Sequence, residues 1–103
     1  MNLKNFGPTG FAGDMDDVIN GFTIVGAFNM NGNKELTRFD GQVSKDGVHI
    51  FDFTSVFVRR PEEENSRLVF RIQELADTGM GAEALASLTT CREKLIEKVQ
   101  KDG

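Results

Sequence analysis

The chain has 103 residues, the length of one domain, and its 39% hydrophobic and 27% charged content is typical of a folded protein rather than a disordered one. A formal net charge of −4 argues against direct binding to a nucleic-acid backbone, which needs a basic surface. The single cysteine, Cys91, excludes an intramolecular disulfide and a zinc site built from several thiolates.

Targeting and membrane-spanning segments are not expected. The N-terminal stretch "MNLKNFGPTGFAG" lacks the apolar core of a signal peptide, and no apolar run approaches the ~20 residues that span a bilayer. We therefore predict a cytoplasmic protein with no membrane partner.

Residues 1–17 are expected to form a Gly-rich N-terminal arm or loop, anchored by Phe6 and Phe11. Within residues 14–21, "DMDDVING", Asp14 is a candidate helix cap and Gly21 a candidate stop. One or two helical turns, or irregular structure, are both compatible with this stretch. The remaining residues, 18–103, are expected to form a single domain.

The strand signals begin at residue 22. Alternating or apolar runs predict strands at residues 22–30, 35–44, 48–58 and 67–73. Asn31-Gly32 and Asp46-Gly47 are hairpin signals, and residues 59–66 are expected to form a longer polar loop. Four strands with short connections predict an antiparallel meander.

One helix is expected at residues 82–101, because apolar side chains recur there at helical spacing. Its predicted stripe consists of Leu85, Leu88, Leu95 and Val99. The sheet is the only large surface on which this stripe can be buried. The predicted fold is therefore α+β, with a four-stranded antiparallel β-meander and one C-terminal amphipathic helix packed across one face (ββββα).

The third predicted strand, "VHIFDFTSVFV", is apolar on both faces. One helix covers only one face, so the second needs another cover, since monomers rarely leave large apolar patches in water. Three covers are open: the N-terminal arm, a bulge at Asp52-Phe53 or Thr54-Ser55 that switches the buried parity, or a second copy of the chain. We expect a homo-oligomer, most simply a dimer. The predicted interface consists of Phe51, Phe53, Phe57, Val25, Phe6 and Phe11.

Motifs for catalysis or cofactor binding are weak. Gly79, Gly81 and Ala84 fit G-x-G-x-x-A, but the dinucleotide fingerprint needs a parallel strand after the helix, and the chain ends there. His49 and Cys91 are the only histidine and cysteine, and no spacing links them into a nucleophilic pair. We therefore expect no catalytic residues, no metal site and no cofactor.

Three functions remain open. The first is a non-enzymatic protein-interaction module that self-associates and binds another protein. The second is a binder of small apolar ligands through a Phe-rich sheet face. The third is an acidic inhibitor, or nucleic-acid mimic, that occupies a partner's basic groove. The acidic contact surface predicted for this third function consists of Asp14, Asp16, Asp17, Glu62, Glu63 and Glu64.

Overall fold

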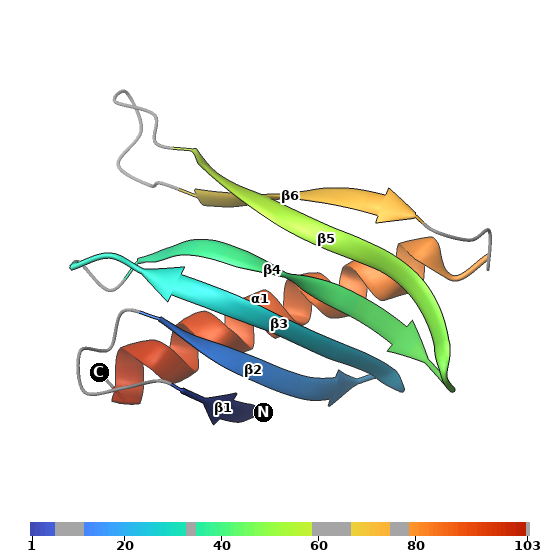
Figure 1. Cartoon of the computed structure of the whole chain (residues 1–103), viewed down its shortest axis with the longest axis horizontal. Helices are drawn as coiled ribbons and strands as arrows, with labels where there is room; N and C mark the ends of the chain where they lie inside the picture. The colour runs from blue at the N-terminus through green and yellow to red at the C-terminus, as the bar shows by residue number, and fades with distance from the viewer. Residues whose placement is uncertain (6–11, 33–34, 59–66, 75–78, 103) are drawn as a thin grey trace.

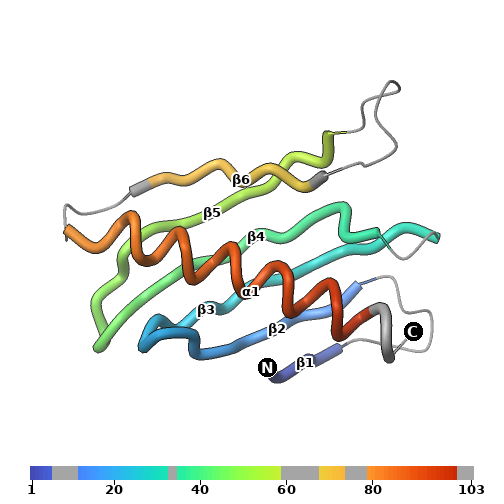
Figure 2. Tube along the Cα trace, turned by 180° about the vertical axis from the view of Figure 1, so that it is seen from behind, coloured from blue at the N-terminus to red at the C-terminus, as the bar shows by residue number. Residues whose placement is uncertain are grey.

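The computed structural model describes residues 1–5, 12–32, 35–58, 67–74 and 79–102. They form one antiparallel sheet, with its strands in chain order, and one helix that crosses one face of the sheet (Figures 1 and 2). The elements are β1 (Asn2–Lys4), β2 (Ala12–Ile19), β3 (Phe22–Met30), β4 (Leu36–Lys45), β5 (Val48–Val58), β6 (Arg67–Glu74) and α1 (Gly81–Asp102). The predicted α+β class and the C-terminal helix on an antiparallel sheet are confirmed. The predicted number of strands is wrong, because the sheet has six strands, not four.

The two additional strands, β1 and β2, lie in the segment predicted to be an arm. Residues 14–19 belong to β2 rather than to a helical turn, and the predicted boundary between residues 17 and 18 falls inside this strand. Asn20 and Gly21 both have positive φ, at 54° and 82°, and form the two-residue turn to β3. The sequence of this turn, Asn-Gly, is a hairpin signal rather than a helix stop.

The sheet has an inner face toward α1 and an outer face that no described element covers (Figures 1 and 2). The inner face carries the core, in which the largest fully buried side chains include Phe22, Phe28, Phe39, Phe51 and Phe53. On β2, β3 and β4 the outer face is mostly polar, and Val18 and Val25 are separated by polar neighbours in the strand register. At the β5–β6 end of the sheet, the exposed residues Val56 and Val69 pair directly. The part of the outer face formed by β2, β3 and β4 therefore needs no second cover to keep a large apolar area dry.

A bulge in β5 explains why Ile50 is buried on the same face as Phe51 and Phe53, although it lies on the other parity. Val43 of β4 pairs with Phe51 and Ser44 with His49, so Ile50 is an extra residue on β5. The bulge lets the consecutive residues Ile50 and Phe51 both be buried, at 1% and 0% exposure. It lies at Ile50, not at either of the positions predicted for it.

Helix α1 is amphipathic. Its buried stripe consists of Ala84, Ser87, Leu88, Cys91, Leu95 and Val99. Leu85, which was predicted to belong to this stripe, is 41% exposed, and Ala84 takes its place against the sheet. Among the residues that the structure describes, no helix combines the length and apolar character that a membrane crossing requires.

A pair of glycines brings β3 and β4 together at the centre of the sheet. Gly26 pairs directly with Gly41. A Cβ atom at Gly41 would overlap the carbonyl oxygen of Val25, and one at Gly26 would lie 2.6 Å from the carbonyl oxygen of Asp40. Backbone atoms cannot move aside as a flexible side chain does, so Gly41 is required by close approach.

We predict that Gly41→Ala lowers the free energy of unfolding by about 3 kcal/mol, since the new methyl group overlaps backbone of the neighbouring strand. Gly32→Ala is the matched control, because a Cβ at Gly32 meets no atom within 4 Å. Urea unfolding followed by circular dichroism measures both. Equal stability of the two variants would contradict the close approach of the strands.

Candidate functional site

The diagonal path of α1 leaves one corner of the inner face uncovered. The helix runs from the C-terminal end of β6 toward β1 and β2, away from the opposite ends of β4, β5 and β6 (Figure 2). A groove of about 540 Å³, open along one side, lies between the helix and this corner. We name it the corner groove. Its sheet wall consists of Leu36, Phe57, Leu68 and Phe70, its helix wall of Leu85, Thr89, Arg92 and Ile96, and Glu35, Glu93 and Val69 complete its lining.

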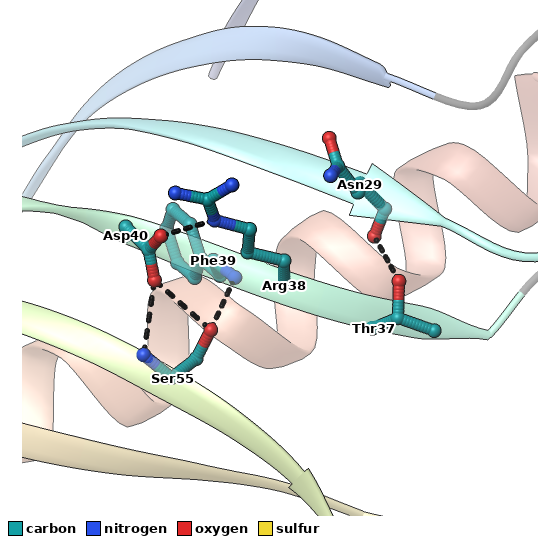
Figure 3. Close-up of polar contacts among 6 residues, drawn as sticks. All are labelled: Asn29, Thr37, Arg38, Phe39, Asp40 and Ser55. Carbon is teal, nitrogen blue, oxygen red and sulfur yellow. Dashed lines mark hydrogen bonds and ion pairs between the residues drawn. The ribbon is translucent and has the colours of Figure 1, made fainter.

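A cluster of side-chain hydrogen bonds lies where β4 and β5 separate at this corner. The strand register between them ends at the pair Gly41–Phe53. Beyond it, the Phe39 amide donates to Ser55 Oγ at 2.7 Å (Figure 3). The amide and the hydroxyl of Ser55 both donate to Asp40 Oδ1, at 2.9 and 3.1 Å. The other carboxylate oxygen of Asp40 accepts from Arg38 Nε. These bonds replace backbone pairing, so β5 diverges from β4 without leaving these groups unsatisfied.

An aromatic cluster connects the groove to the core through Phe70, which lines the groove. The rings of Phe39, Phe53 and Phe70 pack edge to face, with centroids 5.0 to 5.9 Å apart. Arg92 of α1 lies over Phe70, with its guanidinium carbon 5.3 Å from the ring centroid. Arg92 Nη1 also donates to the carbonyl oxygen of Leu68 at 2.9 Å, and its Nε donates to Glu93 at 3.3 Å. This one side chain therefore joins the middle of α1 to the backbone of β6.

The direction of the β6 backbone groups follows from the bonds of Ser55. In an antiparallel sheet the N–H and C=O of one residue point to the same neighbouring strand, and those of the next residue to the other. The Ser55 amide points to β4, so its pair with Phe70 is not hydrogen-bonded. The backbone groups of Leu68, Phe70 and Ile72 therefore point away from β5, to the open edge of the sheet. Arg92 reaches the Leu68 carbonyl at this edge.

The four predicted interface residues that the structure describes do not form one surface. Phe51 and Phe53 are core side chains under α1, at 0% and 1% exposure. Phe57 lines the corner groove, whereas Val25 is 43% exposed on the opposite face of the sheet. Phe6 and Phe11 lie outside the described residues.

The described residues of the predicted acidic surface also lie on different faces of the sheet. Asp14 and Asp16 lie on the outer face of β2, where they accept hydrogen bonds from Asn5 and Asn2 at 2.7 and 2.9 Å. The bond from Asn2 is the main cause of a lowered pKa for Asp16. Asp17 lies on the inner parity of β2, 3.5 Å from the Met1 amino nitrogen. The remaining acidic residues, Glu62, Glu63 and Glu64, lie outside the described residues.

The residues with catalytic chemistry are held in structural contacts. His49 Nε2 lies 2.8 Å from Asp52 Oδ1 at the surface of β5. Cys91 of α1 is fully buried. Gly81 begins α1, but every strand pair in the described sheet is antiparallel, so these glycines lack the parallel-strand context of a dinucleotide site. Within the described residues, no group of three or more His, Cys, Asp or Glu side chains is arranged to hold a metal ion.

Comparisons with known proteins add no family to this description. No protein-family model, no curated protein and no solved structure matches the chain. The argument about function therefore depends on the site itself.

The sequence did contain a signal for the corner groove. Leu85, Thr89, Arg92 and Ile96 recur at steps of four, three and four residues, a second helical stripe beside the buried one. The last strand of a meander is also an edge strand by topology. The contact of Arg92 with β6 has no signal in the sequence, because the two segments meet only in the folded protein.

We predict that Ser55→Ala lowers the free energy of unfolding by about 1–3 kcal/mol, because Phe39 and Asp40 lose their shared partner. Ser44→Ala is the matched control on β4, where the hydroxyl makes no hydrogen bond to a described residue. Urea unfolding measures the difference. If both variants keep the wild-type stability, the Ser55 bonds do not hold β4 and β5 together.

We also predict that Cys91 is chemically inert in the folded protein. Burial, and secondly the nearby Asp17 carboxylate, raise the pKa of the thiol to about 12 from an ordinary value of 9.0. Ellman's reagent at pH 8 should react with it only after unfolding in denaturant, since the thiolate is the nucleophile. Because the pKa is higher in the folded state, the stabilising contribution is complete below pH about 9 and lost as pH rises toward 12. Rapid labelling of the native protein would contradict this burial.

Proposed function

We propose that this chain is a non-enzymatic protein-interaction module that binds an extended segment of a partner protein by adding it as a strand to β6. The observation that carries the proposal is the position of β6, a full-length edge strand beside the corner groove. In strand addition, main-chain hydrogen bonds supply affinity, and pockets for alternate side chains supply specificity. The edge backbone groups of β6 support the first role, and the corner groove beside them supports the second.

The regular register of β6 supports the proposal. All eight residues of the strand pair with β5, from Val58–Arg67 to Phe51–Glu74, with no shift in register. The strand contains neither Pro nor Gly, which often interrupt natural edge strands. At the opposite edge, β1 has only three residues. Of the two edges, β6 is the better template for another strand.

The corner groove supplies the side-chain specificity. Alternate side chains of an added strand would point to the same face as Leu68, Phe70 and Ile72. On that face they would meet Leu85 and Ile96 of α1, so apolar side chains are favoured at these positions. A shallow hollow lined by Ile72, Gly81, Ala82 and Leu85 continues this apolar surface to the end of the strand.

Charge favours a foreign acidic segment over a second copy of the chain. Arg71 is exposed on the outer face of β6 and has no ion-pair partner among the described residues. Outward side chains of the partner are therefore expected to be acidic, which gives a segment of alternating apolar and acidic residues. In two copies paired through β6, the Arg71 side chains of both copies would instead lie on the same outer face, which brings like charges together. Self-association through β6 remains the alternative that the experiment distinguishes.

The open shape of the groove favours a polypeptide over a small apolar ligand, since small-molecule sites bury most of the ligand surface. The acidic-inhibitor function receives less support, because Asp14 and Asp16 accept hydrogen bonds from Asn5 and Asn2 and Asp17 lies on the other face. The corner groove is therefore the preferred site.

We predict that a displayed library of random nine-residue peptides, selected on the wild-type protein, yields peptides that alternate apolar and acidic residues. N-methylation of a selected peptide at every second position should abolish binding in one parity and spare it in the other, because only one parity faces β6. Leu85→Glu should weaken binding by about tenfold or more, through loss of apolar contact and burial of a charge. Isothermal titration calorimetry measures the affinities.

Val18→Glu is the matched control, because Val18 is 63% exposed on β2 and lies outside the groove. Binding that is insensitive to N-methylation would exclude strand addition. Binding of apolar compounds without any peptide would favour the small-ligand function. A stable dimer that Leu85→Glu dissociates would favour a second copy as the occupant.

A further inference from the structure

The contact between Arg92 and Leu68 has a consequence for strand addition. The Leu68 carbonyl points to the open edge of β6, where the amide of an added strand would bind. Arg92 Nη1 already donates to that oxygen at 2.9 Å. The guanidinium therefore uses an acceptor that an incoming strand needs.

We propose that Arg92 is an intramolecular cap on the β6 edge, and that it determines which strands can be added by competing with the incoming amide for the Leu68 carbonyl. This proposal rests on the proposed function for its physiological meaning. It concerns any strand that reaches β6, whether from a foreign protein or from a second copy. Charged or inward-pointing side chains are a common means of protecting sheet edges.

The surroundings of Arg92 favour a releasable cap over a fixed structural bond. The side chain is 24% exposed, and Glu93, on the solvent side of the helix, is 66% exposed and accepts from its Nε. The contact with the Phe70 ring does not depend on the hydrogen bond to Leu68, because it is an attraction between the cation and the ring. Arg92 can therefore leave the Leu68 oxygen and keep both its ring contact and its carboxylate partner. By contrast, Leu88, Leu95 and Val99 of α1 are fixed in the core.

The test compares wild type with Arg92→Met, which keeps an unbranched side chain over Phe70 but removes every donor. Arg92→Lys keeps the charge without the planar fork. Lys94→Met is the matched control, because it removes one positive charge from an exposed position of the same helix. The probe is the nine-residue peptide that binds most tightly among those recovered by display on the wild-type protein. The same selection is repeated on Arg92→Met. Self-association is measured in parallel by light scattering over a dilution series, and thermal melting checks that each variant folds.

We expect Arg92→Met to bind the probe about tenfold more tightly than wild type, because the competing charge-assisted hydrogen bond is gone. Arg92→Lys should lie between them, and Lys94→Met should match wild type. Equal or weaker binding by Arg92→Met would overturn the cap and leave strand addition in place.

The two proposals fail in different ways. If wild type selects no peptide but Arg92→Met selects peptides or assembles with itself, the cap is supported and the proposed function is wrong. If neither protein adds a strand from a peptide or from a second copy, both proposals are wrong. If Arg92→Met does not fold, the same criteria apply to Arg92→Lys, because the shorter lysine side chain holds its donor farther from the carbonyl and weakens the cap.

Discussion

One helix has to cover the inner face of a six-stranded sheet, and the rest of the structure depends on this constraint. A helix of 22 residues is about 33 Å long, enough to cross all the strands, but only about 10 Å wide with its side chains. The diagonal path therefore buries a stripe of the sheet and leaves a corner uncovered (Figure 2). The corner groove follows from this mismatch in shape, and its apolar lining is the part of the core surface that the helix does not reach.

The central part of the fold could be predicted from local signals. Two periodic patterns predicted elements that the structure contains: the alternation over residues 22–30 and 67–73, and the helical spacing of Leu88, Leu95 and Val99. The residue types of Asp46-Gly47 predicted the turn between β4 and β5. Tertiary contacts did not overrule these local signals. The strand β2 was missed for an equally local reason. Its apolar parity carries Asp17 and its polar parity carries Val18, so the alternation is disguised.

The bulge and the site depend on contacts that no local pattern encodes. Ile50 is extra only with reference to its partners on β4, so the apolar character of both parities in β5 could not show where the switch occurs. Phe51, Phe53 and Phe57 share one parity, yet two are core and one lines the groove, because the helix covers only part of their face. The open edge of β6 likewise follows from the strand order, which the sequence predicts, together with the path of the helix, which it does not.

The two edges of the sheet are protected in physically different ways. At the β1 edge, the strand is short and its own side chains bond to β2. Asn2 and Asn5, the residue that follows the strand, donate to carboxylates of β2, and Lys4 pairs with Asp16. Exposing residues Asp14–Asp16 of β2 would require β1 to detach with all these contacts. At β6, the strand is long and regular, and within the described residues the acceptor at Leu68 is shielded by one partly exposed side chain that belongs to another element. Moving Arg92 breaks one hydrogen bond to the edge and leaves every strand pair intact. Within the described residues, several contacts of β1 itself therefore hold one edge of the sheet, whereas one side chain of another element shields the Leu68 acceptor at the other edge. This difference is the physical reason for proposing β6 as the edge for reversible binding.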